Sequence, residues 1–319
     1  MKNVLYIVVP CYNEQEVLPE TARRLKEKIQ DLTECKLIDK ESRIVFVNDG
    51  SKDQTWNLIE KLYMEDSLYC GVNLSRNRGH QNALLAGLSV AVQYADMMIT
   101  LDADLQDDIN AIDGMVRKFQ EGYEIVYGVR SSRKKDTFFK RFTAEGYYKV
   151  LKILGVDIVF NHADYRLMSK RAVEGLMEFE EVNLFLRGIV PQIGYKSATV
   201  TYERAERFAG ESKYPLKKMI AFALEGITSF SVKPLKFIAN LGMVVCLISL
   251  GMFIWSIVQH FLGHTVEGWS SIMVSIWFLG GVQLTSLGVI GEYIGKIYGE
   301  TKRRPKFIIE TVLHDKKGE

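Results

Sequence analysis

Residues 97–108 have the sequence MMITLDADLQDD, an apolar segment followed at once by a cluster of carboxylates. The apolar part, Met97–Leu101, has the length and composition of a buried strand in a parallel sheet. In an open α/β sheet the ligand crevice lies outside the carboxyl ends of the strands. Asp102 and Asp104 at that end can bind a divalent cation whose remaining positions are filled by phosphate oxygens. A lone Asp-x-Asp after a strand more often caps the next helix. The choice between a helix cap and a cation site therefore depends on the other motifs in the chain.

Short apolar segments alternate with amphipathic ones from Asn3 to about Tyr127. This alternation predicts an α/β fold with a doubly wound, mostly parallel sheet and right-handed crossovers. The expected strands are Val4–Val9, Ile44–Val47, Gly71–Leu74, Met97–Leu101 and Ile125–Tyr127, with shorter ones at Asp164–Met168 and Ser197–Tyr202. The expected helices are Glu14–Leu32, Gln54–Tyr63, Gln81–Tyr94 and Ile109–Gln120.

Two long segments without charge follow near the C-terminus, Phe237–Gln259 and Gly268–Gly291. Each exceeds the roughly 20 residues that a helix needs to cross the apolar core of a bilayer. The loop between them has no Lys or Arg, whereas both outer flanks are basic, so the positive-inside rule predicts a two-helix transmembrane hairpin with its flanks in the cytosol. A helical hairpin in the core of a soluble protein is the alternative. We therefore expect a multi-pass protein of the cell inner (cytoplasmic) membrane, with the N-terminal domain and both termini cytosolic.

These features divide the chain into four parts. They are a cytosolic domain at residues 1–212, an amphipathic interfacial helix at 213–233, the hairpin at 234–293 with spans at about 237–260 and 268–292, and a basic cytosolic tail at 294–319. Gly291, Gly295 and Gly299 recur every four residues, which permits a homo-oligomer without requiring one. The four cysteines stand far apart in the sequence, which argues against a zinc site or a disulfide scaffold. Separately, we expect no nucleic-acid partner.

Two more loops follow the ends of expected strands. In the first, VPCYNE at residues 9–14, Pro10 stiffens the exit from the strand and Tyr12 offers a flat face for a base. In the second, NDG at residues 48–50, Asp49 has a carboxylate that can accept hydrogen bonds from a base edge or a ribose. Either loop alone is ordinary turn chemistry. Because neighbouring strand ends converge on one crevice, the three loops together predict a pocket for a nucleotide diphosphate with its metal.

As a set, these motifs resemble glycosyltransferase family 2 and its GT-A fold. The resemblance is carried by Pro10-x-Tyr12-Asn13-Glu14, Asn48-Asp49-Gly50-Ser51-x-Asp53, Asn77-Arg78-Gly79, Asp102-Ala103-Asp104-Leu105-Gln106-Asp107, His162–Met168 and Arg204–Tyr214. The two C-terminal spans narrow it to the polyprenyl-phosphate glycosyltransferases, the group of dolichol-phosphate mannose synthase and, most similar, the bacterial bactoprenol glucosyltransferases. One departure is Asp108, which stands where the family often has Pro.

The resemblance implies an inverting, metal-dependent hexosyltransferase that moves one sugar, glucose as the first expectation, from a nucleotide sugar to polyprenyl (undecaprenyl) phosphate at the cytoplasmic face of the membrane. UDP-glucose is the favoured donor, and Mg²⁺ or Mn²⁺ would be bound by Asp102 and Asp104. The residues implied to bind the nucleotide sugar are Pro10, Tyr12, Glu14, Asp49, Arg78, Asp102, Ala103, Asp104 and Gln106.

A phosphate acceptor carries about −1.5 to −2 charges at pH 7 and is already a nucleophile. The site must therefore hold two anionic groups close together, which arginine does well because its planar fork binds phosphate bidentately. The candidate residues for the acceptor phosphate are Arg130, Arg141, Arg207 and Lys213. A basic patch that faces solvent or lipid headgroups is the alternative for these cations.

Asp164 and Asp104 are the candidate catalytic residues, Asp164 because it matches the family's acidic position before Arg-Leu. A fully ionised acceptor phosphate has no proton to give, so base catalysis, an orienting or electrostatic role, and a structural salt bridge with Arg166 all remain open. Two other functions remain open as well. One is transfer to a lipid hydroxyl such as that of diacylglycerol, which would require a real base, and the other is a non-catalytic membrane scaffold that binds a sugar nucleotide.

Overall fold

A computed structural model of the chain describes residues 3–130, 162–181, 186–203, 233–262 and 268–314. They fall into two compact units. The first contains the N-terminal domain together with the C-terminal tail, and the second contains two long helices. Three candidate acceptor residues, Arg141, Arg207 and Lys213, lie outside the described residues, as does the predicted interfacial helix up to residue 232.

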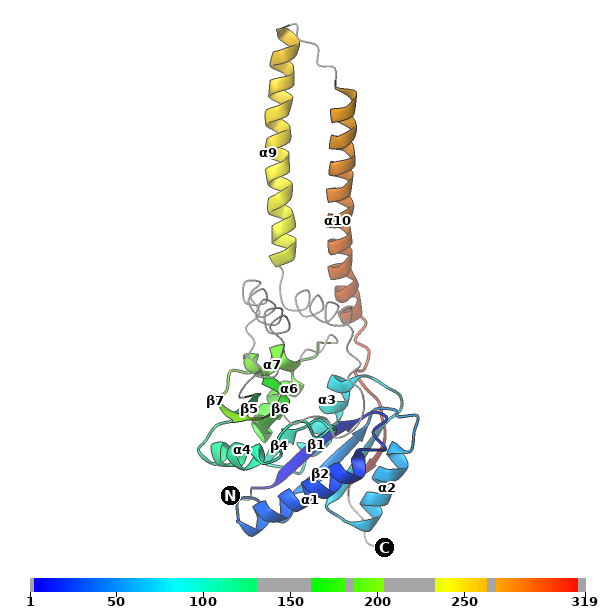
Figure 1. Ribbon diagram of the computed structural model, residues 1–319, viewed down its shortest axis with the longest axis vertical. Coiled ribbons are helices and arrows are strands. Elements are labelled where there is room, and N and C mark those ends of the chain that lie inside the picture. Colours follow the sequence, from blue (N-terminus) through cyan, green and yellow to red (C-terminus); the bar gives the residue numbers. More distant parts are fainter. Residues whose placement is uncertain (1–2, 131–161, 182–185, 204–232, 263–267, 315–319) are drawn as a thin grey trace. The chain divides into compact units, whose positions relative to one another are not determined.

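The first unit is built on one eight-stranded sheet with the order β7-β5-β6-β4-β1-β2-β3-β8 (Figure 1). Strands β6 and β8 run antiparallel to their neighbours, and the other pairings are parallel. The strands are β1 (Leu5–Cys11), β2 (Arg43–Asn48), β3 (Tyr69–Leu74), β4 (Met97–Thr100), β5 (Ile125–Arg130), β6 (His162–Ser169), β7 (Ser197–Tyr202) and β8 (Ile309–Leu313). The predicted doubly wound, mostly parallel sheet is confirmed.

Helices cover both faces of this sheet. Leu5, Ile7 and Val9 of β1 face a core shared with α1, α2 and α4. Val8, which alternates with them along the strand, faces α3 on the other side of the sheet. Helix α3 lies so close to the sheet that a Cβ atom added at Gly87 would be 2.4 Å from the Val8 Cγ1 atom. The helices are α1 (Leu18–Glu34), α2 (Thr55–Glu65), α3 (His80–Ala91), α4 (Ala111–Gln120), α6 (Lys170–Met177) and α7 (Leu186–Gln192).

The strand order reverses between β1 and β4, which pair in parallel with Val8 opposite Thr100. From β1 the chain winds outward through β2 and β3, and then returns to the other side of β1 as β4. Such a switch point opens a crevice at the carboxyl ends of the two strands. The VPCYNE loop and the acidic loop after residue 100 both begin at this edge, as the sequence predicts.

The second unit contains α9 (Lys233–Phe261) and α10 (Trp269–Thr301), which pack against each other. Both helices occur where the sequence predicts the hairpin, and α10 extends beyond the predicted end at residue 292. Many of their apolar side chains are exposed, among them Phe237 at 69% and Leu284 at 72%. Judged over the described residues, however, no helix combines the length and apolar character needed for a bilayer crossing. The helical hairpin is confirmed, and its transmembrane character is not.

Candidate functional site

Three loops meet at the carboxyl edge of the sheet. The loop after β1 is joined to the loop after β2, because the Asn13 amide donates to Ser51 Oγ at 3.0 Å and Asn13 Oδ1 accepts from the Lys52 amide at 2.9 Å. Gly50 has φ +63° and packs against the segment before α3, so that a Cβ atom there would be 2.4 Å from the Asn77 amide nitrogen. Only glycine fits this approach without strain.

Asp49 shapes the start of α3. It is 3% exposed, and its two carboxylate oxygens accept hydrogen bonds from the amides of Arg78 at 2.6 Å and Gly79 at 2.9 Å. Burial raises the pKa of Asp49, although these amide hydrogen bonds oppose the shift. The contact seen in the structure is therefore with the 78–79 backbone, which it fixes beneath the site, and the predicted contact with a base or ribose stays a prediction.

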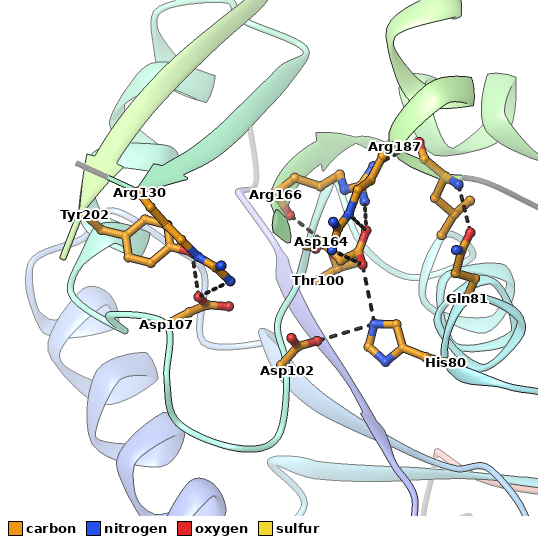
Figure 2. Close-up of polar contacts among 11 residues, drawn as sticks. His80, Gln81, Thr100, Asp102, Asp107, Arg130, Asp164, Arg166, Arg187 and Tyr202 are labelled. Atoms are coloured by element: carbon orange, nitrogen blue, oxygen red, sulfur yellow. Dashed lines mark hydrogen bonds and ion pairs between the residues drawn. The ribbon is translucent and has the colours of Figure 1, made fainter. Parts of the chain in front are cut away.

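Asp102 lies in the acidic loop, 39% exposed, with its Oδ1 atom 3.3 Å from His80 Nε2 (Figure 2). His80 is the first residue of α3, and the same Nε2 atom is 3.8 Å from Oδ2 of Asp164. Desolvation raises the pKa of Asp102 to about 6; His80 opposes this shift, and the negative charges of Asp164, Asp107 and Asp104 add to it. Like charges crowd this carboxylate, so a nearby cation would stabilise it.

The acidic loop has the donor chemistry of a divalent-cation site. Carboxylate oxygens are the ligands that Mg²⁺ and Mn²⁺ prefer, and Mg²⁺ commonly binds one or two carboxylates together with substrate phosphates. Within the described part of the chain, no group of three or more His, Cys, Asp or Glu side chains could hold a metal ion alone. A cation bound by Asp102 and Asp104 would therefore need further ligands, which water or the phosphate oxygens of a bound molecule can supply.

Asp164, near the start of β6, is held between two arginines (Figure 2). Its Oδ1 atom is 2.6 Å from Nη2 of Arg166, whose side chain is 1% exposed, and its Oδ2 atom is 3.2 Å from Nη2 of Arg187. Burial alone would raise the pKa of Asp164, but Arg187 and Arg166 outweigh it and hold the pKa well below its usual range. The salt bridge with Arg166 is thus present. A carboxylate so stabilised in its ionised form is a weak base, which favours an electrostatic or orienting role.

Arg130, a candidate for the acceptor phosphate, belongs to a second cluster in Figure 2. Its Nη2 atom is 3.7 Å from Oδ1 of Asp107, and the Tyr202 hydroxyl donates to the same oxygen at 2.5 Å. The Asp107 side chain is 2% exposed, so it needs these partners. Arg130 therefore already neutralises a buried acid, and its side chain keeps 31% exposure.

Several other residues implied to bind the nucleotide sugar lie around the same carboxyl edge of the sheet. Pro10 is buried within β1, and Tyr12, just after that strand, is 43% exposed, as a stacking platform requires. The Glu14 carbonyl accepts from the Val17 and Leu18 amides and so begins α1. Ala103 is buried and its carbonyl accepts from Thr21 Oγ1 at 2.8 Å.

Sequence reasoning missed His80 and Arg187. His80 directly follows the Asn77-Arg78-Gly79 motif, so its place at the sheet edge could have been inferred from that motif. Arg187 lies in α7, outside every motif, and only tertiary structure brings it to Asp164.

Comparison with known proteins gives two family matches. Residues 6–177 match the profile described as Glycosyl transferase family 2, and residues 233–297 match the profile described as GtrB C-terminal hairpin. The uncharacterized glycosyltransferase YkoT of Bacillus subtilis (strain 168) is 55% identical over 98% of this chain and 93% of its own length. The prophage bactoprenol glucosyl transferase homolog of Escherichia coli (strain K12) is 43% identical over 96% of this chain and 98% of its own. The bactoprenol glucosyl transferase of Shigella phage SfV is 44% identical over 95% and 97%.

Proposed function

Since this chain belongs to glycosyl transferase family 2, we propose that it transfers one glucose from a nucleotide sugar to polyprenyl phosphate. The similarity to proteins named bactoprenol glucosyl transferase carries the proposal, because it covers nearly the whole length of both chains and includes the C-terminal hairpin. The sheet domain is of the GT-A type, and the acidic loop, Asp164 and the arginines around it stand at one edge of it.

We assign the nucleotide sugar, with UDP-glucose favoured, to the three loops at this edge. Tyr12 would stack on the base, and Asp102 and Asp104 would hold Mg²⁺ or Mn²⁺ against the diphosphate. The cation would stabilise the negative charge that develops on the departing diphosphate. The crowded carboxylate of Asp102 supports this role, since a nearby cation relieves the repulsion from neighbouring acids.

The acceptor phosphate would attack the anomeric carbon of the sugar directly. An oxygen of the phosphate forms the new bond as the bond from that carbon to the diphosphate breaks on the opposite face, which inverts the configuration. The reaction then requires no proton transfer to the protein. The environment of Asp164 supports this scheme, because two arginines keep it ionised and occupy its oxygens.

We also propose that α9 and α10 anchor the chain in the cytoplasmic membrane, with the sheet domain and both termini in the cytosol. The charge-free segments Phe237–Gln259 and Gly268–Gly291, the basic flanks and the exposed apolar side chains of the hairpin support the anchor. A lipid acceptor and an anchored enzyme meet in two dimensions, which raises the effective concentration of the acceptor. Resistance of the chain to extraction from membranes with alkaline carbonate would test the anchor.

The decisive experiment measures transfer of radiolabelled glucose into lipid by the purified full-length chain in detergent micelles. UDP-glucose and Mn²⁺ are supplied together with either undecaprenyl phosphate or diacylglycerol. We expect label in lipid only with undecaprenyl phosphate, and loss of that label in Asp104→Asn. Label in diacylglycerol would favour the lipid-hydroxyl function. If no label enters either lipid, the assay is repeated with a panel of other labelled nucleotide sugars, and absence of transfer from all of them would favour the scaffold.

A further inference from the structure

Arg187 lies outside every sequence motif, yet its side chain is held in place by contacts with Asp164. Its guanidinium contacts both oxygens of Asp164, with Nε 3.4 Å from Oδ1 and Nη2 3.2 Å from Oδ2. The side chain is nevertheless 34% exposed, whereas the other arginine on Asp164, Arg166, is 1% exposed. Of these two cations, Arg187 is the one that a ligand can reach.

The backbone next to Arg187 is fixed from two sides. The amide of buried Leu186 donates to Oε1 of Gln81 in α3 at 2.9 Å, and the Leu186 carbonyl accepts from Nη1 of Arg166 in β6 at 3.3 Å. Both polar backbone groups of the preceding residue are therefore tied to different elements of the fold. Such preorganisation lowers the entropy lost when the side chain binds a ligand.

The order of charged groups along the site separates two regions. Figure 2 shows that contacts link Asp102 to His80, His80 to Asp164 and Asp164 to Arg187, at 3.3, 3.8 and 3.2 Å, in a row that bends at His80. Asp102 stands at the end of the row that the donor and its cation would occupy. Arg187 stands at the other end, beyond Asp164.

A reaction between two phosphate-bearing substrates needs a cationic group at such a place. The acceptor phosphate must approach the sugar without being repelled by the donor diphosphate, and arginine binds phosphate oxygens bidentately. Arg130 is committed to buried Asp107, whereas Asp164 is shared between Arg166 and Arg187. Buried Arg166, 2.6 Å from Asp164, already pairs with this carboxylate, so Asp164 does not need the more exposed Arg187 as its counter-ion.

We propose that Arg187 binds the phosphate group of the acceptor and that Asp164 is the positioning residue that aims its guanidinium. The proposal rests on the proposed function and names a contact for its acceptor. Buried ion clusters give little net stability over apolar packing, so stability alone is a weak reason for three charged side chains to gather here.

The test compares Arg187→Ala and Arg187→Lys with a matched control, Arg171→Ala. Arg171 also pairs with a carboxylate, Glu124, at 2.9 Å, but it is 62% exposed and is not part of the row from Asp102 to Arg187. Initial rates of glucose transfer are measured first with undecaprenyl phosphate varied at saturating UDP-glucose. They are then measured with UDP-glucose varied at saturating undecaprenyl phosphate. Thermal unfolding of each variant in the same micelles is recorded alongside.

We expect Arg187→Ala to raise the KM for undecaprenyl phosphate at least about tenfold, as for a lost hydrogen bond to a charged group, with the KM for UDP-glucose changed less than about twofold. Arg187→Lys should recover part of the loss, and millimolar guanidinium should restore activity to Arg187→Ala but not alter Arg171→Ala. If Arg187→Ala fails to fold, the same KM split in Arg187→Lys decides the question.

A rise in the KM for UDP-glucose instead would place Arg187 on the donor and overturn the proposal. Kinetics equal to those of Arg171→Ala would reduce Arg187 to a structural partner of Asp164. Both results require an active wild-type chain and leave the proposed function intact. A wild-type chain that transfers no glucose to undecaprenyl phosphate overturns the proposed function, and this inference with it.

Discussion

Replacing Asp164 with Asn keeps the size of the side chain and removes the charge that neutralises a buried guanidinium. Arg166 is 1% exposed and its Nη2 atom is 2.6 Å from Asp164, so the variant leaves a cation without a counter-ion and out of reach of water. Breaking a buried pair in this way costs about 3–5 kcal/mol of stability. Arg187, which is 34% exposed, can regain water and adds little to that cost. For a domain of this size, the loss corresponds to a fall in Tm of roughly 6–20 °C.

The loss should not depend on pH near neutrality. Burial raises the pKa of Asp164, but Arg187 and Arg166 lower it further, and the pKa in the folded chain lies well below the ordinary value of about 3.9. The stability that ionised Asp164 contributes is therefore complete above pH of about 4 and is lost only as the pH falls through the lower, folded value. The difference in Tm between wild type and Asp164→Asn should therefore be constant above about pH 7, where Asp102, whose pKa of about 6 is raised in part by the charge of Asp164, is ionised as well.

The assay is thermal unfolding of full-length variants in detergent micelles, arranged as a double-mutant cycle of Asp164→Asn with Arg166→Met. The double variant removes both buried charges and should be more stable than the sum of the single losses predicts. Asp113→Asn is the matched control, because Asp113 pairs with Lys28 at 2.9 Å while 39% exposed, and such a pair contributes about 0–1 kcal/mol. The reasoning is refuted if Asp164→Asn unfolds like Asp113→Asn, or if the two losses simply add.

Three further outcomes are expected. Gly50→Ala should lower the denaturation midpoint more than Gly122→Ala, since both glycines have positive φ but only the former would bring a Cβ atom within 2.4 Å of the Asn77 amide; equal shifts would exclude the clash. Tyr202→Phe should cost about 1–3 kcal/mol in the same measurement, because buried Asp107 loses its 2.5 Å donor, and an unchanged midpoint would show that Asp107 does not need the hydroxyl. EDTA should abolish glucose transfer and added Mn²⁺ or Mg²⁺ should restore it, whereas full activity in EDTA would remove the metal from the proposed function.

The sheet could be predicted from sequence as far as local patterns reach. Apolar strands and amphipathic helices alternate along the chain, and Ser197–Tyr202 was predicted with the bounds that β7 has. Pairings between distant segments carry no such local signal. Strand β8 lies within the predicted basic tail and pairs with β3 across more than two hundred residues, and β6 enters antiparallel between β4 and β5.

The residues of the site also fall into those that the sequence predicts and those that only the tertiary structure reveals. Asp102 and Asp104 could be predicted because they directly follow an apolar strand, and topology brings the ends of neighbouring strands together. Arg187 could not, since its position depends on the backbone contacts of Leu186 with α3 and β6. Asp49 shows a further limit: its motif marks it as important, but only coordinates reveal that its oxygens accept hydrogen bonds from the Arg78 and Gly79 amides.

The environments of Asp102 and Asp164 shift their pKa values in opposite directions, and together they bear on the kind of acceptor. Desolvation and nearby acids raise the pKa of Asp102, which fits a carboxylate that awaits a cation, whereas arginines lower that of Asp164 and keep it ionised. Once a cation occupies Asp102, neither carboxylate is suited to take a proton from a hydroxyl near pH 7, since a general base works best when its pKa is near the operating pH. A phosphate acceptor needs no such base. The same two carboxylates that would make the site a poor catalyst for a lipid hydroxyl therefore suit it to an acceptor that is already an anion.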